Sequence, residues 1–346
     1  MIDPIILLFL LQDGLTNGAL YALLGLALVL VFTVTRVIFI PQGEFVAYGA
    51  LSYALLETGR VPGTIWLLVA MGVAAFAIEA ITRGSRMTGR EWTTAAVLDL
   101  GLPIAIAGLT LAFASKTTPA LVNLLLTLAM IAPLGPYLYR IAFQPIADST
   151  ILTLFTTAIG VHLAMTGLGL ALFGAEGLRA KPLTDASLPV GPIVLTGQNI
   201  AVYLATAALI IGLWLFFERS LYGKALRATA INRVGARLVG IRTSLSGGLT
   251  FGLAAGIGAI SGILIVPMTT IYYDSGFLIG LKGFVAAIIG ALASYPATAI
   301  AALFVGIAEA FASFYASAFK EIIVFMLIVP VLVWRSLGAV HDDEEE

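Results

Sequence analysis

Cysteine is absent from the 346 residues, and histidine occurs only twice. Without cysteine there are no disulfide bonds, thiolate nucleophiles or cysteine-ligated metal sites. With two histidines, one in the C-terminal segment, we expect no zinc or haem site and no other cofactor. Charged residues are also scarce, at 11% of the chain against about 25% in an ordinary soluble domain. So few charges cannot cover the surface of a soluble protein.

Motifs for catalysis are missing as well. The chain has no G-x-x-x-x-G-K-[ST] phosphate loop, because Gly223 and Lys224 are followed by Ala225 and lack the upstream glycine. Neither H-E-x-x-H nor G-x-S-x-G occurs. We therefore expect a protein that is not an enzyme and does not hydrolyse ATP by itself. The formal net charge of −1 says little about partners, and we expect no nucleic-acid partner.

Apolar residues dominate what is present: 60% of the chain is hydrophobic, and mean hydropathy is +1.05. Only helices satisfy every backbone polar group in lipid over such runs, so the sequence predicts an all-α polytopic membrane bundle of about 8–11 segments. The predicted apolar segments are roughly 15–35, 45–57, 64–82, 95–114, 119–138, 151–173, 199–217, 246–267, 277–295, 297–316 and 321–334.

Some of these segments are short for a bilayer crossing. Segments 45–57 and 321–334 are therefore expected to be tilted, broken or re-entrant.

The N-terminal residues 1–14 lack a basic region and a cleavage site, so we expect them to be retained as a short helix before the first span. One transmembrane domain, residues 1–335, is predicted, followed by an acidic cytoplasmic tail at 336–346.

Lysine and arginine predict the orientation. If the loop at 218–245 is cytoplasmic and each span crosses, twelve basic residues fall on the cytoplasmic side and five on the other, and Lys282 lies inside a span. This distribution is typical of a multi-pass inner (plasma) membrane protein. It predicts an N-terminus outside the cell and a C-terminus in the cytoplasm.

The stretch from Leu221 to Arg242 interrupts the apolar sequence with basic residues at helical spacing. An apolar residue recurs every fourth position, which predicts one amphipathic helix at about 224–239. Gly240 follows where a left-handed residue would end that helix. Such a helix either lies on anionic headgroups or docks into a groove of a cytoplasmic partner.

Eight residues of this stretch match the sequence pattern of a known protein family. The matching residues are Ala228, Thr229, Ala230, Asn232, Ala236, Arg237, Gly240 and Ile241. They resemble the cytoplasmic loop of branched-chain amino acid ABC transporter permeases, the Liv-type inner-membrane subunits. The wider E-A-A-x-x-x-G signature of ABC importers is similar, but Val234 stands in place of its glutamate. The resemblance implies that this helix, Arg233 included, couples the permease to ATPase subunits.

Two further blocks resemble the same family. Arg36 and the run Gln42, Gly43, Glu44 and Phe45 match the turn after the family's first span. Residues 276–311 match a second block around Lys282, with Ala291 among the alanines that replace glycine. The predicted segments 45–57 and 277–295 each follow a polar break and have a glycine and a phenylalanine at their start, a pattern that paired broken helices of an internal repeat would produce.

Ionisable residues inside spans are costly and mark either functional sites or polar contacts. They are Glu44, Asp99, His162, Lys282 and Glu309. Glu44 either lines a cavity or is favoured by the helix dipole. Lys282 either pairs with Glu309 or Glu44, or extends to the external surface. Asp99 and His162 match no motif and are interpreted as helix contacts, whereas Gln42, Gly43, Glu44, Phe45, Lys282 and Glu309 are the candidate pathway residues.

The resemblance implies a permease subunit of an ABC importer for branched-chain amino acids or similar small solutes. It implies three kinds of partner in addition to the lipid bilayer: a homologous or identical second permease, two cytoplasmic ATPase subunits and an extracytoplasmic solute-binding protein. Two alternatives remain open. One is a stand-alone secondary transporter that uses Glu44, Lys282 and Glu309 for ion coupling. The other is a membrane scaffold whose basic helix binds lipid.

Overall fold

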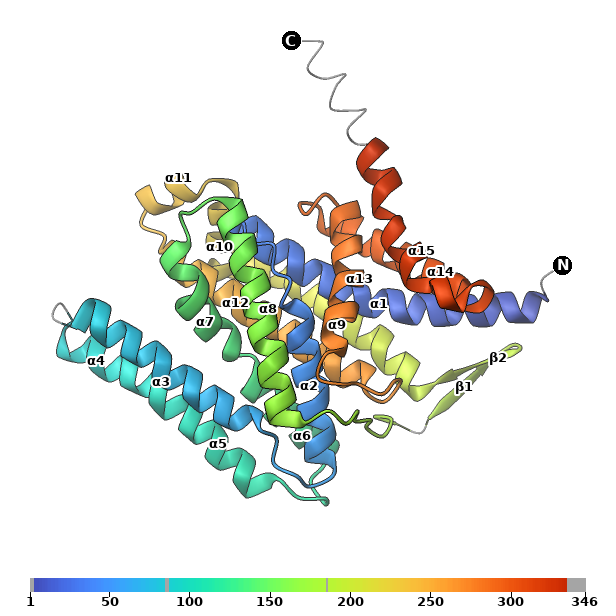
Figure 1. Ribbon diagram of the computed structural model, residues 1–346, viewed down its shortest axis with the longest axis horizontal. Helices are drawn as coiled ribbons and strands as arrows, with labels where there is room; N and C mark the ends of the chain where they lie inside the picture. The colour runs from blue at the N-terminus through green and yellow to red at the C-terminus, as the bar shows by residue number, and fades with distance from the viewer. Residues whose placement is uncertain (1–2, 85–86, 185, 335–346) are drawn as a thin grey trace, which may run out of the picture.

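The computed structural model describes residues 3–84, 87–184 and 186–334, so the predicted acidic tail lies outside the described residues. Figure 1 labels the α-helices and the strands. The elements are α1 (Pro4–Thr35), α2 (Gln42–Glu57), α3 (Thr64–Arg83), α4 (Gly89–Ala96), η2 (Val97–Gly101), α5 (Leu102–Phe113), α6 (Ala120–Ile131), α7 (Leu134–Leu138), η3 (Tyr139–Phe143), η4 (Gln144–Ile146), α8 (Ile151–Phe173), β1 (Ser187–Val190), β2 (Ile193–Thr196), α9 (Gly197–Arg219), α10 (Leu221–Ile231), α11 (Arg233–Leu238), α12 (Thr243–Ile265), α13 (Ser275–Ile289), α14 (Tyr295–Tyr315), η5 (Ser317–Phe319) and α15 (Lys320–Met326).

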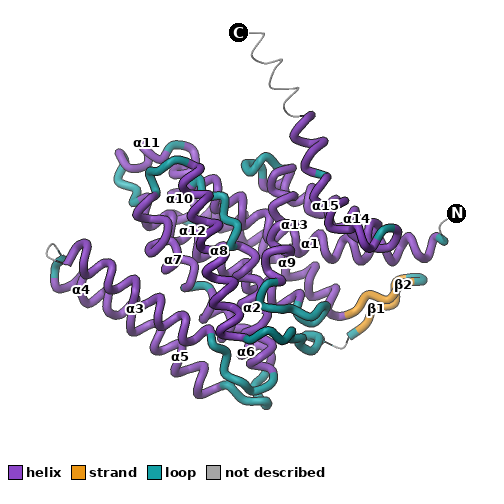
Figure 2. The backbone as a smooth tube through the Cα atoms, in the orientation of Figure 1, coloured by secondary structure: helices purple, strands orange, loops and turns teal. Residues whose placement is uncertain are grey.

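Helices make up nearly all of the described chain, as Figure 2 shows, and β1 and β2 form one antiparallel hairpin. In the described ranges, nine helical segments are long and apolar enough to cross a membrane. Helices α2 and α13 are shorter, with 16 and 15 residues. The prediction of an all-α polytopic bundle is confirmed.

Helix α1 is continuous over 32 residues, so the expectation of a separate short helix before the first span is wrong. Its start is fixed by Asp3, whose carboxylate accepts a hydrogen bond from the Ile5 N–H at 2.9 Å. Gly14 and Gly18 allow α14 to approach closely, because a Cβ on either would meet α14 backbone at 2.6 and 2.7 Å. Both glycines lie inside the continuous helix α1 and serve its packing against α14.

Helices α2 and α13 begin in the middle of the bundle. Gln42 opens α2, and its side-chain amide donates to the carbonyl of Ala254, near the midpoint of α12, at 2.9 Å. Gly276 in the first turn of α13 lies against Gly43, where an added Cβ would stand 1.9 Å from the Gly276 carbonyl oxygen. Both helices are thus half-length elements that start at one common level.

Each half-length helix follows a long helix and a non-helical segment. Residues 36–41 connect α1 to α2, and residues 266–274 connect α12 to α13. Helix α2 ends near the hairpin side, where the Glu57 carboxylate accepts from the Lys181 N–H at 2.9 Å. Helix α13 ends at Ile289, shortly before α14, whose first residue, Tyr295, packs against Phe217 at the end of α9 away from the hairpin. The two units therefore run in opposite directions, as an inverted repeat requires.

The centre of the bundle is α2, which is buried along almost its whole length and packs mainly against α12, α13 and α6. Phe39 in the non-helical segment is fully buried, and its ring lies 4.7 Å from that of Phe251 and 5.8 Å from that of Phe45. Protein covers most of this irregular backbone: Val37 and Pro41 are also buried, Ile38 and Ile40 are partly buried, and Arg36 is exposed. That environment is the one in which non-helical backbone is tolerated at membrane depth.

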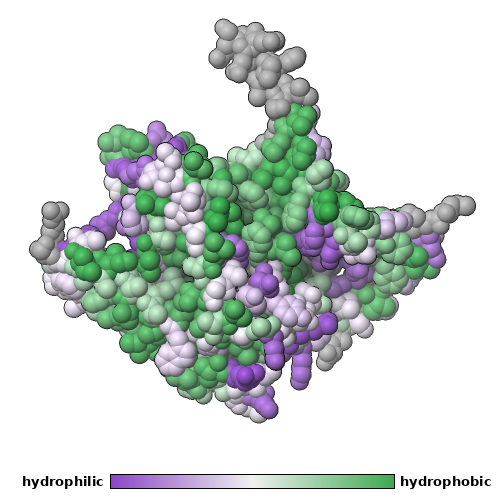
Figure 3. Space-filling view, viewed as in Figure 1, coloured by the Kyte–Doolittle hydropathy of each residue, from purple (hydrophilic) through white to green (hydrophobic). Residues whose placement is uncertain are grey.

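The periphery is apolar and exposed. Helix α3 and the α4–α5 segment extend together as an arm at the lower left of Figure 1. Trp66 and Ile81 on α3 are 62% and 84% exposed. Hydrophobic residues cover much of the visible face in Figure 3, the arm and α15 included. Such a surface is unfavourable in water and matches a lipid environment.

Candidate functional site

The basic segment forms two helices, α10 and α11, and the prediction of one helix at 224–239 is wrong. Asn232 separates them in an extended conformation, with φ −149° and ψ 101°. Its side-chain oxygen accepts from the Gly235 N–H at 2.8 Å, so Asn232 is the N-cap of α11. Asparagine competes in this way for backbone donors, and the four-residue apolar spacing carried no sign of the break.

The end of α11 is as predicted. Gly240 has φ +86°, the left-handed region that glycine occupies without strain. The Gly240 N–H donates to the carbonyl of Arg237 at 3.1 Å, and the Ile241 N–H donates to that of Ala236 at 2.9 Å. This pair of bonds is a Schellman motif, which satisfies the last carbonyls of the helix.

Polar contacts connect α10 and α11 to the rest of the bundle. Thr229 is buried and donates to Ser246 of α12 at 3.3 Å. Arg233 donates to the carbonyl of Ala147 at 2.9 Å, and Arg237 donates to Asp148 at 3.0 Å. Because Ala147 and Asp148 lie between η4 and α8, the two arginines join α11 to that connection.

The predicted apolar stripe is divided between two surfaces. Leu226 is buried against α1, whereas Val234 and Leu238 are 67% and 83% exposed. Ala236 is buried, Ala228 and Ala230 are partly buried, and Asn232 is exposed. Ile231, at 82% exposed, adds to the outward apolar surface. We call the exposed set Ile231, Val234, Leu238 and Val239 the α11 edge.

Glu44 lies in the first turn of α2, where the two half-length helices meet, and is fully buried. Its Oε1 lies 2.9 Å from Nδ1 of His162 on α8, and its Oε2 has no hydrogen-bond partner among the described residues. The His162 ring stacks on Phe277 of α13 at 4.6 Å and is 14% exposed. His162, which matched no motif, is therefore part of this site.

Lys282 pairs with Glu309 and not with Glu44. Its Nζ donates to Oε1 of Glu309 at 2.5 Å and lies 3.2 Å from Glu321 of α15. The Tyr21 hydroxyl donates to the other oxygen of Glu309 at 2.5 Å. The Lys282 side chain is 8% exposed, so it does not extend to the surface. The sequence-predicted pathway residues thus fall into two separate clusters.

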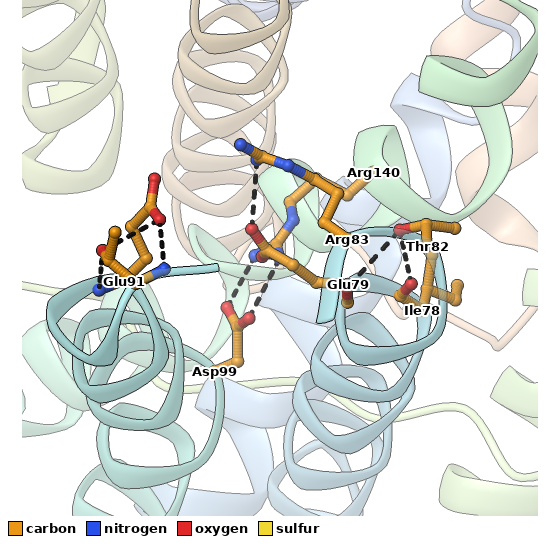
Figure 4. A network of polar contacts seen from close by, with 8 residues as sticks. Ile78, Glu79, Thr82, Arg83, Glu91, Asp99 and Arg140 are labelled. Carbon is orange, nitrogen blue, oxygen red and sulfur yellow. Dashed lines mark hydrogen bonds and ion pairs between the residues drawn. The ribbon is translucent and has the colours of Figure 1, made fainter. Parts of the chain in front are cut away.

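Asp99 belongs to a third cluster, shown in Figure 4, which includes two residues that sequence reasoning did not select. Arg140 contacts both oxygens of Asp99, at 2.6 and 3.0 Å, and also pairs with Glu79 of α3. A guanidinium forms this fork with a carboxylate, and a lysine does not. The cluster joins the α3–α5 arm to η3, a structural role that agrees with the interpretation of Asp99 as a helix contact.

Metal binding has no support in the described ranges, where no three histidine or carboxylate side chains gather in a way that could hold an ion. Each cluster instead places one basic side chain against carboxylates: Arg140 against Asp99 and Glu79, Lys282 against Glu309 and Glu321, and His162 against Glu44. Buried ionisable groups are tolerated where partners and hydrogen bonds of this kind are available.

A family model described as the branched-chain amino acid transport system, permease component, matches residues 10–332. The chain is 25% identical over 344 residues to the high-affinity branched-chain amino acid transport system permease protein LivH of Escherichia coli K12, covering 96% of this chain and 95% of LivH. It is 28% identical over 219 residues to the corresponding protein BraD of Pseudomonas aeruginosa, covering 61% and 71% of the two chains. The solved structure of PsaBC from Streptococcus pneumoniae in complex with Fab aligns with 94% of this chain and 90% of that chain, at 13% identity and a TM-score of 0.37.

Proposed function

Since this chain belongs to the family of permease components of branched-chain amino acid transport systems, we propose that it is the membrane subunit of an ABC importer and that separate ATPase subunits supply its energy. It pairs with a second permease, identical or homologous, and receives its solute from an extracytoplasmic binding protein. The solute is a branched-chain amino acid or a similar small molecule, the cargo named for LivH and BraD.

One observation carries the proposal: the α11 edge is apolar and exposed at the end of the bundle, while Arg233 and Arg237 of the same helix bind it to other segments. Val234 and Leu238 project outward, and Arg237 contacts Asp148 before α8. An exposed apolar helix edge beside cations is the surface that enters a partner's groove. Movement of α11 by ATPase closure would therefore reach α8 through Asp148, and α9 and α12 through the chain.

The pathway is proposed to pass the meeting point of α2 and α13. Half-length helices that begin at one level form substrate sites in other transporters. Gln42, Gly43, Glu44 and Phe45 occupy this level, and His162 is the member of the cluster that reaches the surface. Lys282 and Glu309 hold α13 against α1 and α14 rather than contacting solute.

The experiment co-expresses the chain with an ABC ATPase pair and measures co-purification and ATPase stimulation. We expect Val234→Asp and Leu238→Asp to weaken co-purification about tenfold or more, because each places a charge in an apolar groove. Leu188→Asp on β1, 52% exposed and distant from α11, is the matched control. Undiminished co-purification of both α11 variants would exclude this edge as the ATPase contact.

Orientation is tested with a membrane-impermeant thiol reagent. The chain has no cysteine, so Asn232→Cys introduces one unique, exposed label site. We expect labelling in inside-out vesicles and not in intact cells. The opposite result would reverse the proposed topology and remove the basis for a cytoplasmic ATPase contact.

The secondary-transporter alternative rests on the unpartnered Glu44 Oε2. Purified chain in liposomes distinguishes the two functions. Uptake driven by an ion gradient without ATPase subunits would support the alternative. Uptake that requires ATP, the ATPase pair and the binding protein supports the importer.

A further inference from the structure

A cavity of about 590 Å³ lies between α1, α9, α10 and α14. Leu26 and Val34 of α1, Leu213 and Phe217 of α9, and Leu226 of α10 form much of its wall. The wall is therefore largely aliphatic and aromatic. Cavities with such walls hold water poorly, because a buried water needs polar partners.

The cavity opens onto the lipid-facing side of α9. Trp214 and Ile210 line it and are 59% and 37% exposed, and Leu215 next to them is 43% exposed. Helix α9 is itself long and apolar enough to cross a membrane. A groove on this surface is therefore continuous with the hydrocarbon of the bilayer, whose chains fill such space better than water does.

Polar groups gather at one end of the cavity. Arg227 lines it. The Arg227 side chain is 48% exposed, and its guanidinium donates to Glu218 at 2.8 Å. That bond uses one of five N–H donors, so several remain for an anion. Arg219 and Lys224 are exposed on the same stretch, which gives three cations against the single carboxylate of Glu218. Trp214 and Tyr295 line the same cavity, and such residues are enriched where hydrocarbon meets the headgroups.

We propose that this cavity holds an acyl chain of an anionic phospholipid whose phosphate is bound by Arg227. The apolar wall accommodates the chain, and the excess of cations at its mouth selects the negative headgroup. The lipid then fills the space between α10 and the spans α1, α9 and α14. It therefore supports α10, which leads into α11 and the α11 edge. The site needs no ATPase subunit and is independent of the proposed function.

The test uses Trp214 as a reporter. Replacement of Trp66, Trp92 and Trp334 by phenylalanine leaves one tryptophan, and brominated acyl chains quench its fluorescence on contact. Phosphatidylcholine bilayers receive a fixed minor fraction of a brominated lipid, either phosphatidylglycerol or phosphatidylcholine. We expect about fivefold stronger occupancy by the anionic lipid, the ratio given by about 1 kcal/mol for one cation.

Two variants test the headgroup contact and the acyl-chain cavity separately. Arg227→Gln is expected to make quenching by the two brominated lipids equal, whereas Arg90→Gln, on exposed α4, is the matched control and leaves the preference unchanged. Ala299→Phe fills the cavity and is expected to reduce quenching by both lipids. A measurement of thermal unfolding identifies any variant that has lost its fold, and Arg227→Gln, a surface change, keeps the test valid if Ala299→Phe fails.

Three outcomes would overturn the proposal. Equal quenching by both lipids in the parent protein would mean that the site does not select a headgroup. A preference unchanged by Arg227→Gln would place the anion elsewhere. Protection of Trp214 from both lipids would mean that protein, such as a second copy of the chain, covers the cavity.

Discussion

Oε1 of Glu44 lies 2.9 Å from Nδ1 of His162, although 118 residues separate them in the chain. The carboxylate is fully buried and sits where α2 begins, and the imidazole reaches it from α8. A carboxylate at the centre of an apolar bundle needs a hydrogen-bond partner, because an unpartnered buried charge is costly. The contact therefore fixes the position of α8 against α2.

His162→Phe tests this contact. The phenyl ring can still stack on Phe277, but Glu44 loses its partner. We expect the free energy of unfolding to fall by about 1–3 kcal/mol, the cost of leaving a buried polar group unsatisfied. The double variant Glu44→Met/His162→Phe removes both polar groups and is expected to recover most of that loss. Thermal unfolding in detergent measures both, and a double variant no more stable than the single one would contradict the prediction.

The same double variant separates fold from transport. If Glu44 contacts the solute, the folded double variant assembled with its ATPase and binding protein is expected to show little uptake. Uptake at the parental rate would exclude a pathway role for Glu44 while leaving its structural role intact.

Gly43→Ala tests the contact between the half-length helices. Its Cβ would stand 1.9 Å from the carbonyl oxygen of Gly276, so α2 and α13 would have to separate. We expect a loss of stability of several kcal/mol, beyond the ~1–3 kcal/mol of ordinary overpacking, because the obstructing atom is backbone. Gly160→Ala on α8 is the matched control, with no atom within 4 Å of its Cβ, and is expected to be neutral or slightly stabilising. Yield and thermal unfolding compare the two, and equal behaviour would refute the close contact.

Lys282→Met leaves Glu309 buried without its cation. Removal of one partner of a buried ion pair costs about 3–5 kcal/mol, whereas replacing both by apolar residues is often neutral. We therefore expect low stability for Lys282→Met and recovery in Lys282→Met/Glu309→Met, measured by thermal unfolding. Uptake by the recovered double variant is expected to be near the parental rate, since this pair is assigned to structure. A stable double variant without uptake would instead place the pair in the pathway.

Ala291→Gly is expected to stabilise the protein. Ala291 has φ +63°, where an L-residue pays about 1–2 kcal/mol and glycine does not. Glycine loses about 0.4–1 kcal/mol through the entropy of the unfolded chain, so the net gain is about 0.5–1 kcal/mol. Ala164→Gly, at an exposed helical position of α8, is the control and is expected to destabilise by a similar amount. A lower midpoint of thermal unfolding for Ala291→Gly would contradict the assigned backbone conformation.

Several features of the site followed from local sequence. Gly240 ends its helix as predicted, because a left-handed cap depends on the residues beside it. The short segment 45–57 corresponds to α2, because apolar length is also a local property. Asn232 was missed as a break: the spacing of apolar residues continues through it, and only its cap on Gly235 distinguishes two helices from one.

The sequence by itself determined the class of protein, the number and approximate limits of its apolar segments, and the motifs that placed it in its family. Those depend on composition and on residues near one another in the chain. The tertiary structure alone decided that Lys282 pairs with Glu309, that Glu44 meets His162, and that Arg140 joins Asp99 to Glu79. A buried charge must find a partner, but which residue supplies it depends on helix packing, and hydropathy along the chain does not record which faces meet.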